Sequence, residues 1–290
     1  MARRHLLRSL LTRAGYDVQR VRDGAWLVQK RGADQSLTLQ HVGSAKNGPV
    51  LLIDDDGTSK RRRQHRDALD AHFADEHLAW VLQKLRIDCV LDVGANRGQF
   101  ARRLRGLGFA GRIASFEPVP ALLADLRLAA ADDPAWFIHP YALGDEDGSA
   151  EINVVAGKMS SMLEPSEFGS DWAAKLRDSH TETIQLRRLD SVFDDAVAGL
   201  PHPRVLLKLD TQGYDLQAFR GGGGRLAEVL ALQSEVACVP IYEGMPRMPE
   251  QLSEYESAGF EVSAMFPVTR HRQSMRVIEF DVLMVRPDSD

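Results

Sequence analysis

The sequence predicts an α/β fold, in which a doubly wound sheet of about seven strands follows a small α+β extension. Three observations predict it. From about residue 79 onward, short apolar runs typical of buried strands alternate with amphipathic segments. A glycine turn follows the first of these runs directly and opens the next helix. Acidic residues stand at the ends of several predicted strands, where open α/β sheets bind their ligands.

The first core strand is predicted at residues 89–93, which are apolar apart from Asp92. Gly94 and Gly98 then permit a tight turn and a close approach of the backbone to a ligand. A helix is predicted after Gly98, so backbone amides at its start face a polar or anionic group. The next strand ends at Glu117, which follows Gly94 by 23 positions (117 − 94). This is close to the spacing at which a dinucleotide fold presents a carboxylate to a ribose.

The turn departs from the dinucleotide pattern G-x-G-x-x-G, because it has Asp92-x-Gly94-x-Asn96-x-Gly98. A pyrophosphate requires bare amides, whereas Asp92 adds negative charge at the end of the strand. This favours a ligand with an ammonium or sulfonium group and no phosphate. The alternative is an ordinary strand-to-helix turn, with Glu117 as a solvated strand end.

The remaining elements follow in order along the chain. The predicted helices are 2–15, 66–85, 99–107, 121–130, 215–219 and 248–258. The predicted strands are 26–30, 36–40, 50–53, 112–116, 136–139, 150–155, 183–189, 204–210, 228–236, 260–266 and 279–285. We expect residues 1–78 to form the N-terminal extension and residues 79–290 the catalytic domain.

The composition is that of an ordinary globular chain, with 44% hydrophobic and 27% charged residues. The net charge of −5 argues against general nucleic-acid binding. Cys89 and Cys238 lie in apolar runs, which favours buried thiols in a reducing compartment, and we expect a cytoplasmic protein. No apolar run approaches the ~20 residues that a transmembrane helix needs. The basic amphipathic segment 2–15 is expected to dock on its own domain or to form a homodimer; the alternative is a membrane surface.

Five segments in order resemble the FkbM-type S-adenosylmethionine (SAM) dependent methyltransferases, over about residues 80–286. They are Val90-Leu91-Asp92-Val93-Gly94-Ala95-Asn96-Arg97-Gly98, Phe116-Glu117-Pro118, Ala142-Leu143-Gly144-Asp145, Arg188-Leu189-Asp190-Ser191-Val192 and Leu207-Lys208-Leu209-Asp210-Thr211-Gln212-Gly213. The resemblance implies a Rossmann-like class I fold and O-methylation of a hydroxyl on a sugar, an oligosaccharide or a glycosylated small molecule. The usual acidic residue is replaced by Gln212, which removes any role of that carboxylate.

By the same resemblance, the cofactor site is expected to include a set of residues from the first three motifs. They are Asp92, Gly94, Asn96 and Gly98 around the methionine part, Glu117 at the ribose, and Ala142, Leu143 and Asp145 at the adenine. The competing hypotheses are an NAD(P)-dependent oxidoreductase of similar fold and a catalytically inactive binding module.

A sugar hydroxyl is weakly acidic, so methyl transfer to it needs a general base or a metal. Asp210 ends a central strand, and it can accept a proton or join Glu235 in holding Mg²⁺. Lys208 lies within an apolar strand and needs a carboxylate partner, either Asp92 or Asp210. His139 is a second candidate base, or a packed strand-end histidine. The acceptor-side candidates are Ser161, Tyr242 and His271.

Overall fold

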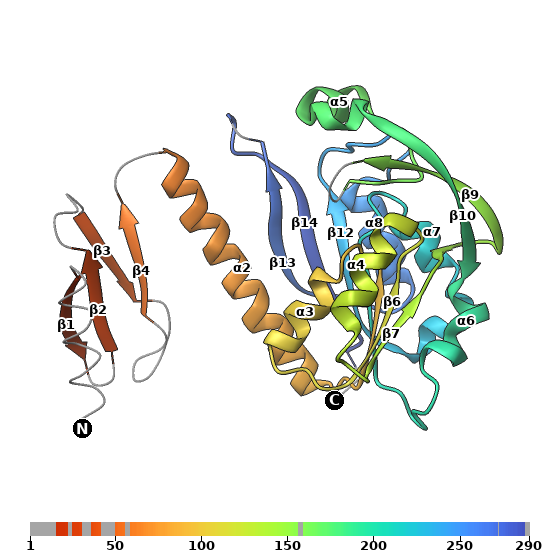
Figure 1. The fold of residues 1–290 in the computed structure, drawn as a ribbon, viewed down its shortest axis with the longest axis horizontal. Helices are drawn as coiled ribbons and strands as arrows, with labels where there is room; N and C mark the ends of the chain where they lie inside the picture. The colour runs from red at the N-terminus through yellow and green to blue at the C-terminus, as the bar shows by residue number, and fades with distance from the viewer. Residues whose placement is uncertain are drawn as a thin grey trace. The chain divides into compact units, whose positions relative to one another are not determined.

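The computed structural model describes residues 16–22, 25–30, 36–41, 50–55, 59–155, 159–271 and 273–287 (Figure 1). The chain divides into two compact units, residues 1–69 and 70–290. The division falls within the long helix α2 (Ser59–Lys84), as does the boundary expected near residue 78. No helix in the described part of the chain is long and apolar enough to cross a bilayer.

The first unit contains two antiparallel strand pairs. β1 (Tyr16–Arg22) pairs with β2 (Ala25–Lys30), and β3 (Ser36–His41) pairs with β4 (Val50–Asp55). β2, β3 and β4 were predicted, whereas β1 was not, because its polar residues give little hydrophobic alternation. The predicted helix over 2–15 lies outside the described residues.

The second unit is built on a seven-stranded sheet in the order β13-β14-β12-β11-β5-β6-β7. β14 is antiparallel to both of its neighbours, and the other neighbouring pairs are parallel. The strands are β5 (Cys89–Val93), β6 (Arg112–Phe116), β7 (Trp136–His139), β11 (Val205–Leu209), β12 (Val229–Ala237), β13 (Glu261–Arg270) and β14 (Val277–Val285). The predicted doubly wound, Rossmann-like class I fold is confirmed.

The chain runs outward from β5 through β6 to β7 and then returns to the other side of β5 as β11. The switch point of the topology therefore lies between β5 and β11, and a ligand is expected outside their carboxyl ends.

Helices cover both faces of the sheet (Figure 1). On one face, α2, α3 (Gln99–Gly106) and α4 (Pro120–Ala130) bury Val81, Leu104 and Leu126. On the other face, α6 (Leu189–Ala196), α7 (Asp215–Arg220) and α8 (Met248–Ser257) bury Phe193, Phe219 and Tyr255. Strands buried on both faces are apolar nearly throughout, which is why the sequence predicted them well.

A smaller sheet stands beside the main one, in the order β8-β10-β9. It consists of β8 (Ala142–Gly144), β9 (Gly148–Val155) and β10 (Ser179–Arg188), and α5 (Glu167–Trp172) lies between β9 and β10 in the chain. β9 and β10 were predicted with shorter spans, but β8, α5 and α6 were not predicted. β8 and α5 have only three and six residues, too few to give a periodic signal.

Gly94 makes the close contact between β5 and the end of β11 possible. Its φ is +75°, and a Cβ atom there would lie 2.0 Å from the backbone oxygen of Asp210. We expect Gly94→Ala to lower the free energy of unfolding by at least about 3 kcal/mol, because positive-φ strain and a backbone clash add. Urea unfolding of the purified variant measures this loss.

Gly108→Ala is the matched control, because Gly108 also has a positive φ, +85°, but a Cβ atom there meets nothing within 4 Å. Strain alone should cost about 1 kcal/mol. Equal losses in the two variants would contradict the role assigned to Gly94.

Candidate functional site

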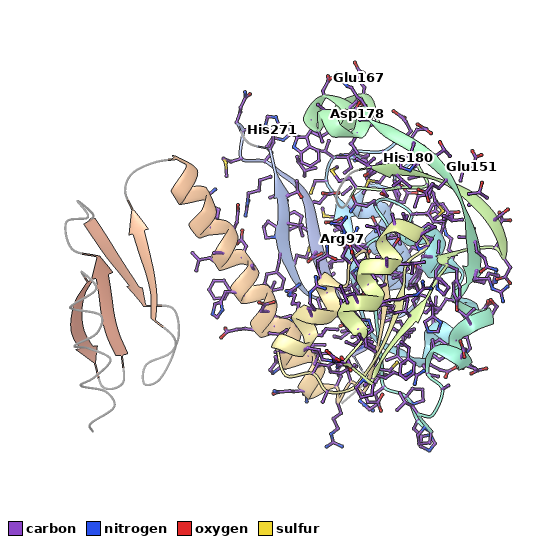
Figure 2. The ribbon with its side chains drawn as sticks, viewed as in Figure 1. Arg97, Glu151, Glu167, Asp178, His180 and His271 are labelled. Carbon is purple, nitrogen blue, oxygen red and sulfur yellow. The ribbon has the colours of Figure 1, made fainter. Side chains whose placement is uncertain are left out.

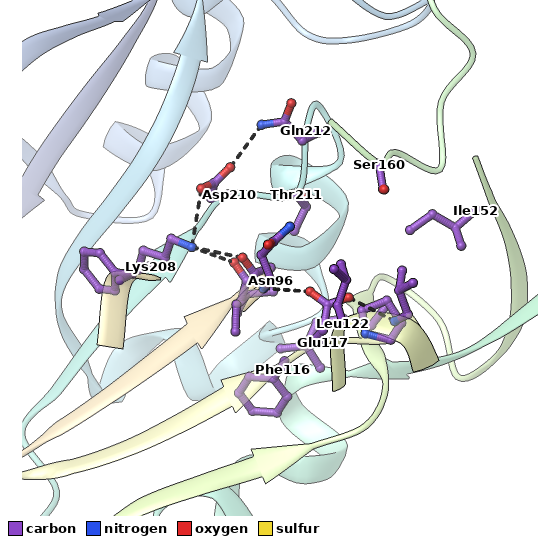
Figure 3. Close-up of a pocket in the computed structure, with 18 of the residues that line it drawn as sticks. Asn96, Phe116, Glu117, Leu122, Ile152, Ser160, Lys208, Asp210, Thr211 and Gln212 are labelled. Carbon is purple, nitrogen blue, oxygen red and sulfur yellow. Dashed lines mark hydrogen bonds and ion pairs between the residues drawn. The ribbon is translucent and has the colours of Figure 1, made fainter. Parts of the chain in front are cut away.

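A pocket opens at the switch point, above the carboxyl ends of β5, β6 and β11 (Figure 3). The space between its walls is about 810 Å³, counting the solvent at its mouth. Its lining residues are Val93, Gly94, Ala95, Asn96, Gln99, Phe100, Phe116, Glu117, Pro118, Val119, Leu122, Ala142, Leu143, Ile152, Ser160, Met162, Lys208, Asp210, Thr211 and Gln212.

Glu117 is held on the pocket wall by two backbone amides. The amide of Asn96 donates to Oε2 at 2.7 Å and the amide of Val119 donates to Oε1 at 2.9 Å. Asn96 has a φ of +51°, which directs its N–H across the turn toward β6. Burial raises the pKa of Glu117 to about 7, although both amides and Lys208 pull the pKa down. The carboxylate keeps lone pairs that can accept further hydrogen bonds.

Lys208 and Asp92 form a buried ion pair beneath the pocket, with Nζ 3.0 Å from Oδ1. The parallel register places the two residues opposite each other on β11 and β5. Asp210 lies 3.5 Å from the same ammonium. Burial alone would lower the pKa of Lys208, but the two carboxylates outweigh it and raise that pKa. The two carboxylates therefore favour the charged form of Lys208, which fits a structural ion pair. Asp92 and Asp210, the two alternative partners expected from the sequence, both lie within ion-pair distance, and a catalytic role of Lys208 stays a prediction.

The second oxygen of Asp92 is held from the next two strands. The hydroxyl of Ser115 donates to Oδ2 at 3.1 Å, and the indole N–H of Trp136 donates to that hydroxyl oxygen at 2.9 Å. A Cβ atom on Gly98 would lie 2.6 Å from the Trp136 ring, so this glycine makes room for the indole. Gly98 therefore allows Trp136 to pack behind Asp92.

Asp210 stands at the edge of the pocket with 43% of its side chain exposed. The side-chain amide of Gln212 donates to Asp210 Oδ1 at 3.1 Å and to Glu235 Oε2 at 3.0 Å. Figure 3 shows Asp210 between Gln212 and Lys208. The carboxylate is therefore fixed by a donor on each oxygen while one side faces the pocket.

Further acidic side chains lie beyond Asp210, on β12 and β14. Glu235 lies opposite Asp281 in the antiparallel register, and Glu279 is two residues away. Burial and the neighbouring Glu279 and Asp210 raise the pKa of Glu235 well above its usual value. Burial first, and the nearby acids second, raise the pKa of Asp281 to about 6; burial raises that of Glu279 to about 7. Burial and mutual repulsion therefore favour the neutral forms of these acids.

Five of the eight predicted cofactor residues line the pocket. They are Gly94, Asn96, Glu117, Ala142 and Leu143. Asp92 lies below the pocket surface with no solvent exposure, Gly98 packs on Trp136, and the Asp145 side chain is exposed outside the pocket lining.

His139 packs against neighbouring aromatic side chains. Its ring stacks on Phe116 with centroids 4.7 Å apart, and Nδ1 lies 3.1 Å from the hydroxyl of Tyr141. Burial lowers the pKa of His139, and the residue does not line the pocket. The packed strand-end alternative fits this position better than a base does.

The three acceptor-side candidates lie outside the pocket lining. Ser161 is fully buried and donates to the backbone oxygen of Gln212 at 2.7 Å. Tyr242 is buried and donates to the backbone oxygen of Met159 at 2.9 Å. His271 lies at the turn between β13 and β14, where it contacts Ser274 (Figure 2). Ser161 and Tyr242 therefore support the wall rather than face a ligand.

Several residues that line the pocket were not predicted from the sequence. Among them are Phe100, Leu122, Ile152, Ser160, Met162 and Gln212. Ile152, Ser160 and Met162 come from β9 and the segment after it, far along the chain from the first glycine turn. Only Gln212 carried a signal, since it departs from the motif that ends β11.

The described residues offer no cluster of three His, Cys, Asp or Glu side chains placed to hold a metal ion. The amide nitrogen of Gln212 lies between Asp210 and Glu235, the two expected magnesium ligands. The Mg²⁺ site thus stays a prediction without support from the described part of the chain.

Comparison with protein families matches residues 92–262 to the methyltransferase FkbM domain. The 2-O-methyltransferase NoeI of Sinorhizobium fredii (strain NBRC 101917 / NGR234) is 26% identical over 203 residues, which cover 67% of this chain and 78% of that protein.

Solved structures with a similar course of the chain include two methyltransferase-related proteins. Aeropyrum pernix fibrillarin, in complex with natively bound S-adenosyl-L-methionine, has a TM-score of 0.41 and 13% identity, covering 93% of this chain and 94% of its own. Magnesium protoporphyrin IX methyltransferase from Synechocystis PCC 6803, with bound SAM, has a TM-score of 0.40 and 10% identity, covering 77% and 83%.

Removal of Lys208 should leave Asp92 buried without a counter-charge. We expect Lys208→Met to lower the free energy of unfolding by about 3–5 kcal/mol, and the double variant with Asp92→Asn to recover much of that loss. Urea unfolding of the two single variants and the double variant measures the coupling.

Arg177→Met is the control, because Arg177 pairs with Asp171 on the exposed surface and should leave the unfolding midpoint nearly unchanged. Additive effects of Lys208→Met and Asp92→Asn would show that the two residues do not depend on each other.

Proposed function

From the premise that the chain belongs to the FkbM methyltransferase family, we propose that it is a SAM-dependent O-methyltransferase. The proposed acceptor is a hydroxyl of a sugar, an oligosaccharide or a glycosylated small molecule. The observation that carries the proposal is the pair of carboxylates in one pocket. Glu117 is fixed by two backbone amides, and Asp210 is fixed between Lys208 and Gln212.

The pocket residues fit SAM by their chemistry. Glu117 is suited to accept hydrogen bonds from the two ribose hydroxyls, because both of its oxygens are already oriented by the amides. Val119, Leu122 and Met162 provide an apolar wall for an adenine ring. A bound SAM would supply a methyl group on a positively charged sulfur.

Asp210 is the proposed general base. Its carboxylate would accept the proton of the acceptor hydroxyl while the hydroxyl oxygen forms a bond to the methyl carbon and the carbon–sulfur bond breaks. The sulfur keeps the electron pair of the broken bond. Alignment of the oxygen behind the methyl group contributes most of the rate enhancement, so a rigidly held base is what the site needs.

The sugar acceptor rests on the resemblance to FkbM-type enzymes and on the relative that is a 2-O-methyltransferase. A nicotinamide cofactor is the weaker alternative, because the turn after β5 lacks the G-x-G-x-x-G pattern that receives a pyrophosphate and carries Asp92 just before it. A thermal-shift comparison of SAM, S-adenosylhomocysteine and NADH separates the two cofactors. The homodimer and the cytoplasmic location stay predictions.

The affinity for S-adenosylhomocysteine should rise with pH up to about pH 7. Burial raises the pKa of Glu117 to about 7 without ligand, and only the ionised carboxylate has all of its lone pairs for the ribose hydroxyls. Below that pH the affinity should therefore fall by up to about tenfold per pH unit. Calorimetric titration between pH 5.5 and 8.5 measures this.

The raised pKa of Glu117 also affects how the stability of the unliganded protein depends on pH. The neutral form of Glu117 is favoured in the unliganded fold, so its contribution to stability is lost as pH rises through about 7, and a bound ribose should restore it. Glu117→Gln should weaken binding at pH 8 by about tenfold or more and flatten the pH dependence. A wild-type affinity that does not vary with pH would refute the ribose assignment.

Asp210→Asn should abolish most methyl transfer while S-adenosylhomocysteine still binds. Loss of the base should lower kcat by about 10²–10⁴-fold, because the amide cannot accept the proton. The measurement is S-adenosylhomocysteine release in the presence of a panel of monosaccharides and glycosides, for the wild type and the variant.

Asp132→Asn is the matched control, since Asp132 is an exposed aspartate outside the pocket lining and its loss should leave kcat unchanged. Equal turnover in Asp210→Asn and the wild type would eliminate Asp210 as the base. EDTA and added Mg²⁺ belong in the same assay; a loss of turnover with EDTA that Mg²⁺ restores would support the magnesium prediction.

A further inference from the structure

Gln212 lines the pocket, and it also takes part in four hydrogen bonds with neighbouring residues. Its amide nitrogen donates to Asp210 and Glu235, and its amide oxygen lies 3.3 Å from the hydroxyl of Tyr242, which shares its one proton between this oxygen and the backbone oxygen of Met159. Its backbone oxygen accepts from the buried hydroxyl of Ser161. Each polar atom of the side chain therefore has a partner that suits it, and the reverse orientation of the amide would place its oxygen between two carboxylates.

The backbone at this position is held in an unfavourable conformation. Gln212 has a φ of +55°, in the left-handed region, and Gly213 follows with a φ of +96°. A residue other than glycine is strained there. This backbone conformation turns the Gln212 side chain back over the end of β11 toward Asp210.

Without the amide, Asp210 and Glu235 would lose the donor they share. Asp210 would keep Lys208, whose Nζ lies 3.5 Å from Oδ2, and could rotate toward this ammonium and away from the pocket. Glu235 would face Asp210, Glu279 and Asp281 with no donor between them.

We propose that Gln212 is a positioning residue for methyl transfer: its side-chain amide separates Asp210 from Glu235 and fixes the Asp210 carboxylate toward the acceptor hydroxyl. This proposal rests on the proposed function. Tyr242 and Ser161 act one step further out, since they hold Gln212 itself. Glutamate at position 212 would set another acidic group against Asp210 and Glu235 and could not donate to both, so an amide is the group that this arrangement requires.

The test compares Gln212→Met, which keeps the length of the side chain but removes its donor, with Gln212→Glu. With the acceptor that the wild type methylates best, we expect Gln212→Met to lower kcat by about 10–100-fold. The KM of the acceptor and the affinity for S-adenosylhomocysteine should change by less than about threefold, because the amide is already engaged with Asp210, Glu235 and Tyr242. Gln185→Met, on the exposed side of β10, is the control for the substitution itself.

Gln212→Glu should be at least as impaired as Gln212→Met, because a carboxylate cannot donate to Asp210 or Glu235 as the amide does. An unchanged kcat in Gln212→Met or in Gln212→Glu would overturn the proposal.

A second measurement does not depend on an acceptor. If the wild type methylates nothing in the panel, the proposed function fails, and urea unfolding still tests Gln212. Gln212→Glu should be less stable than Gln212→Met, because its carboxylate would stand against Asp210, and adding Asp210→Asn should remove most of that difference. A difference that Asp210→Asn leaves in place would show that the amide does not separate these carboxylates.

Discussion

The ion pair between Lys208 and Asp92 is the interaction on which the rest of the site depends. It joins β11 to β5 at the switch point of the sheet, in a place with almost no solvent. Two charges there are tolerated only if each has partners, and the structure supplies them on both sides. Asp92 is held by Ser115, and Lys208 also contacts Asp210 and the backbone oxygen of Gly94 at 3.3 Å. The pair therefore fixes both the glycine turn and the proposed base.

The same interaction explains why the glycines of the first motif are needed. Gly94 allows β5 to approach the backbone of Asp210, and Gly98 leaves room for Trp136, which holds Ser115 behind Asp92. Neither requirement involves a ligand directly. The motif therefore allows a row of polar contacts across β7, β6, β5 and β11, and the pocket lies above this row. The row consists of Trp136, Ser115, Asp92 and Lys208.

The sequence predicted the fold and the cofactor side of the site better than the acceptor side. Strands buried on both faces are apolar, and the turn that follows β5 has a recognisable spacing, so Gly94, Asn96 and Glu117 were found. Asp92 was expected at the ligand, but its register with Lys208 makes it a buried partner, and register between distant strands is not visible in one sequence. For the same reason Ser161 and Tyr242 were chosen as polar residues near the acceptor, whereas long-range packing turns them toward Gln212 and Met159.

Glu117 and Asp210 are both carboxylates that follow parallel strands, β6 and β11, on either side of β5, and their surroundings separate their roles. Glu117 is buried, its pKa is raised to about 7, and it accepts from backbone amides whose positions the turn fixes. Asp210 is partly exposed and is held by side chains, a lysine below and a glutamine beside it. A group fixed by the backbone in a dry site is suited to recognise an invariant part of a ligand, since its geometry cannot adapt. A group that reaches solvent and is held by side chains is suited to exchange a proton with a variable acceptor.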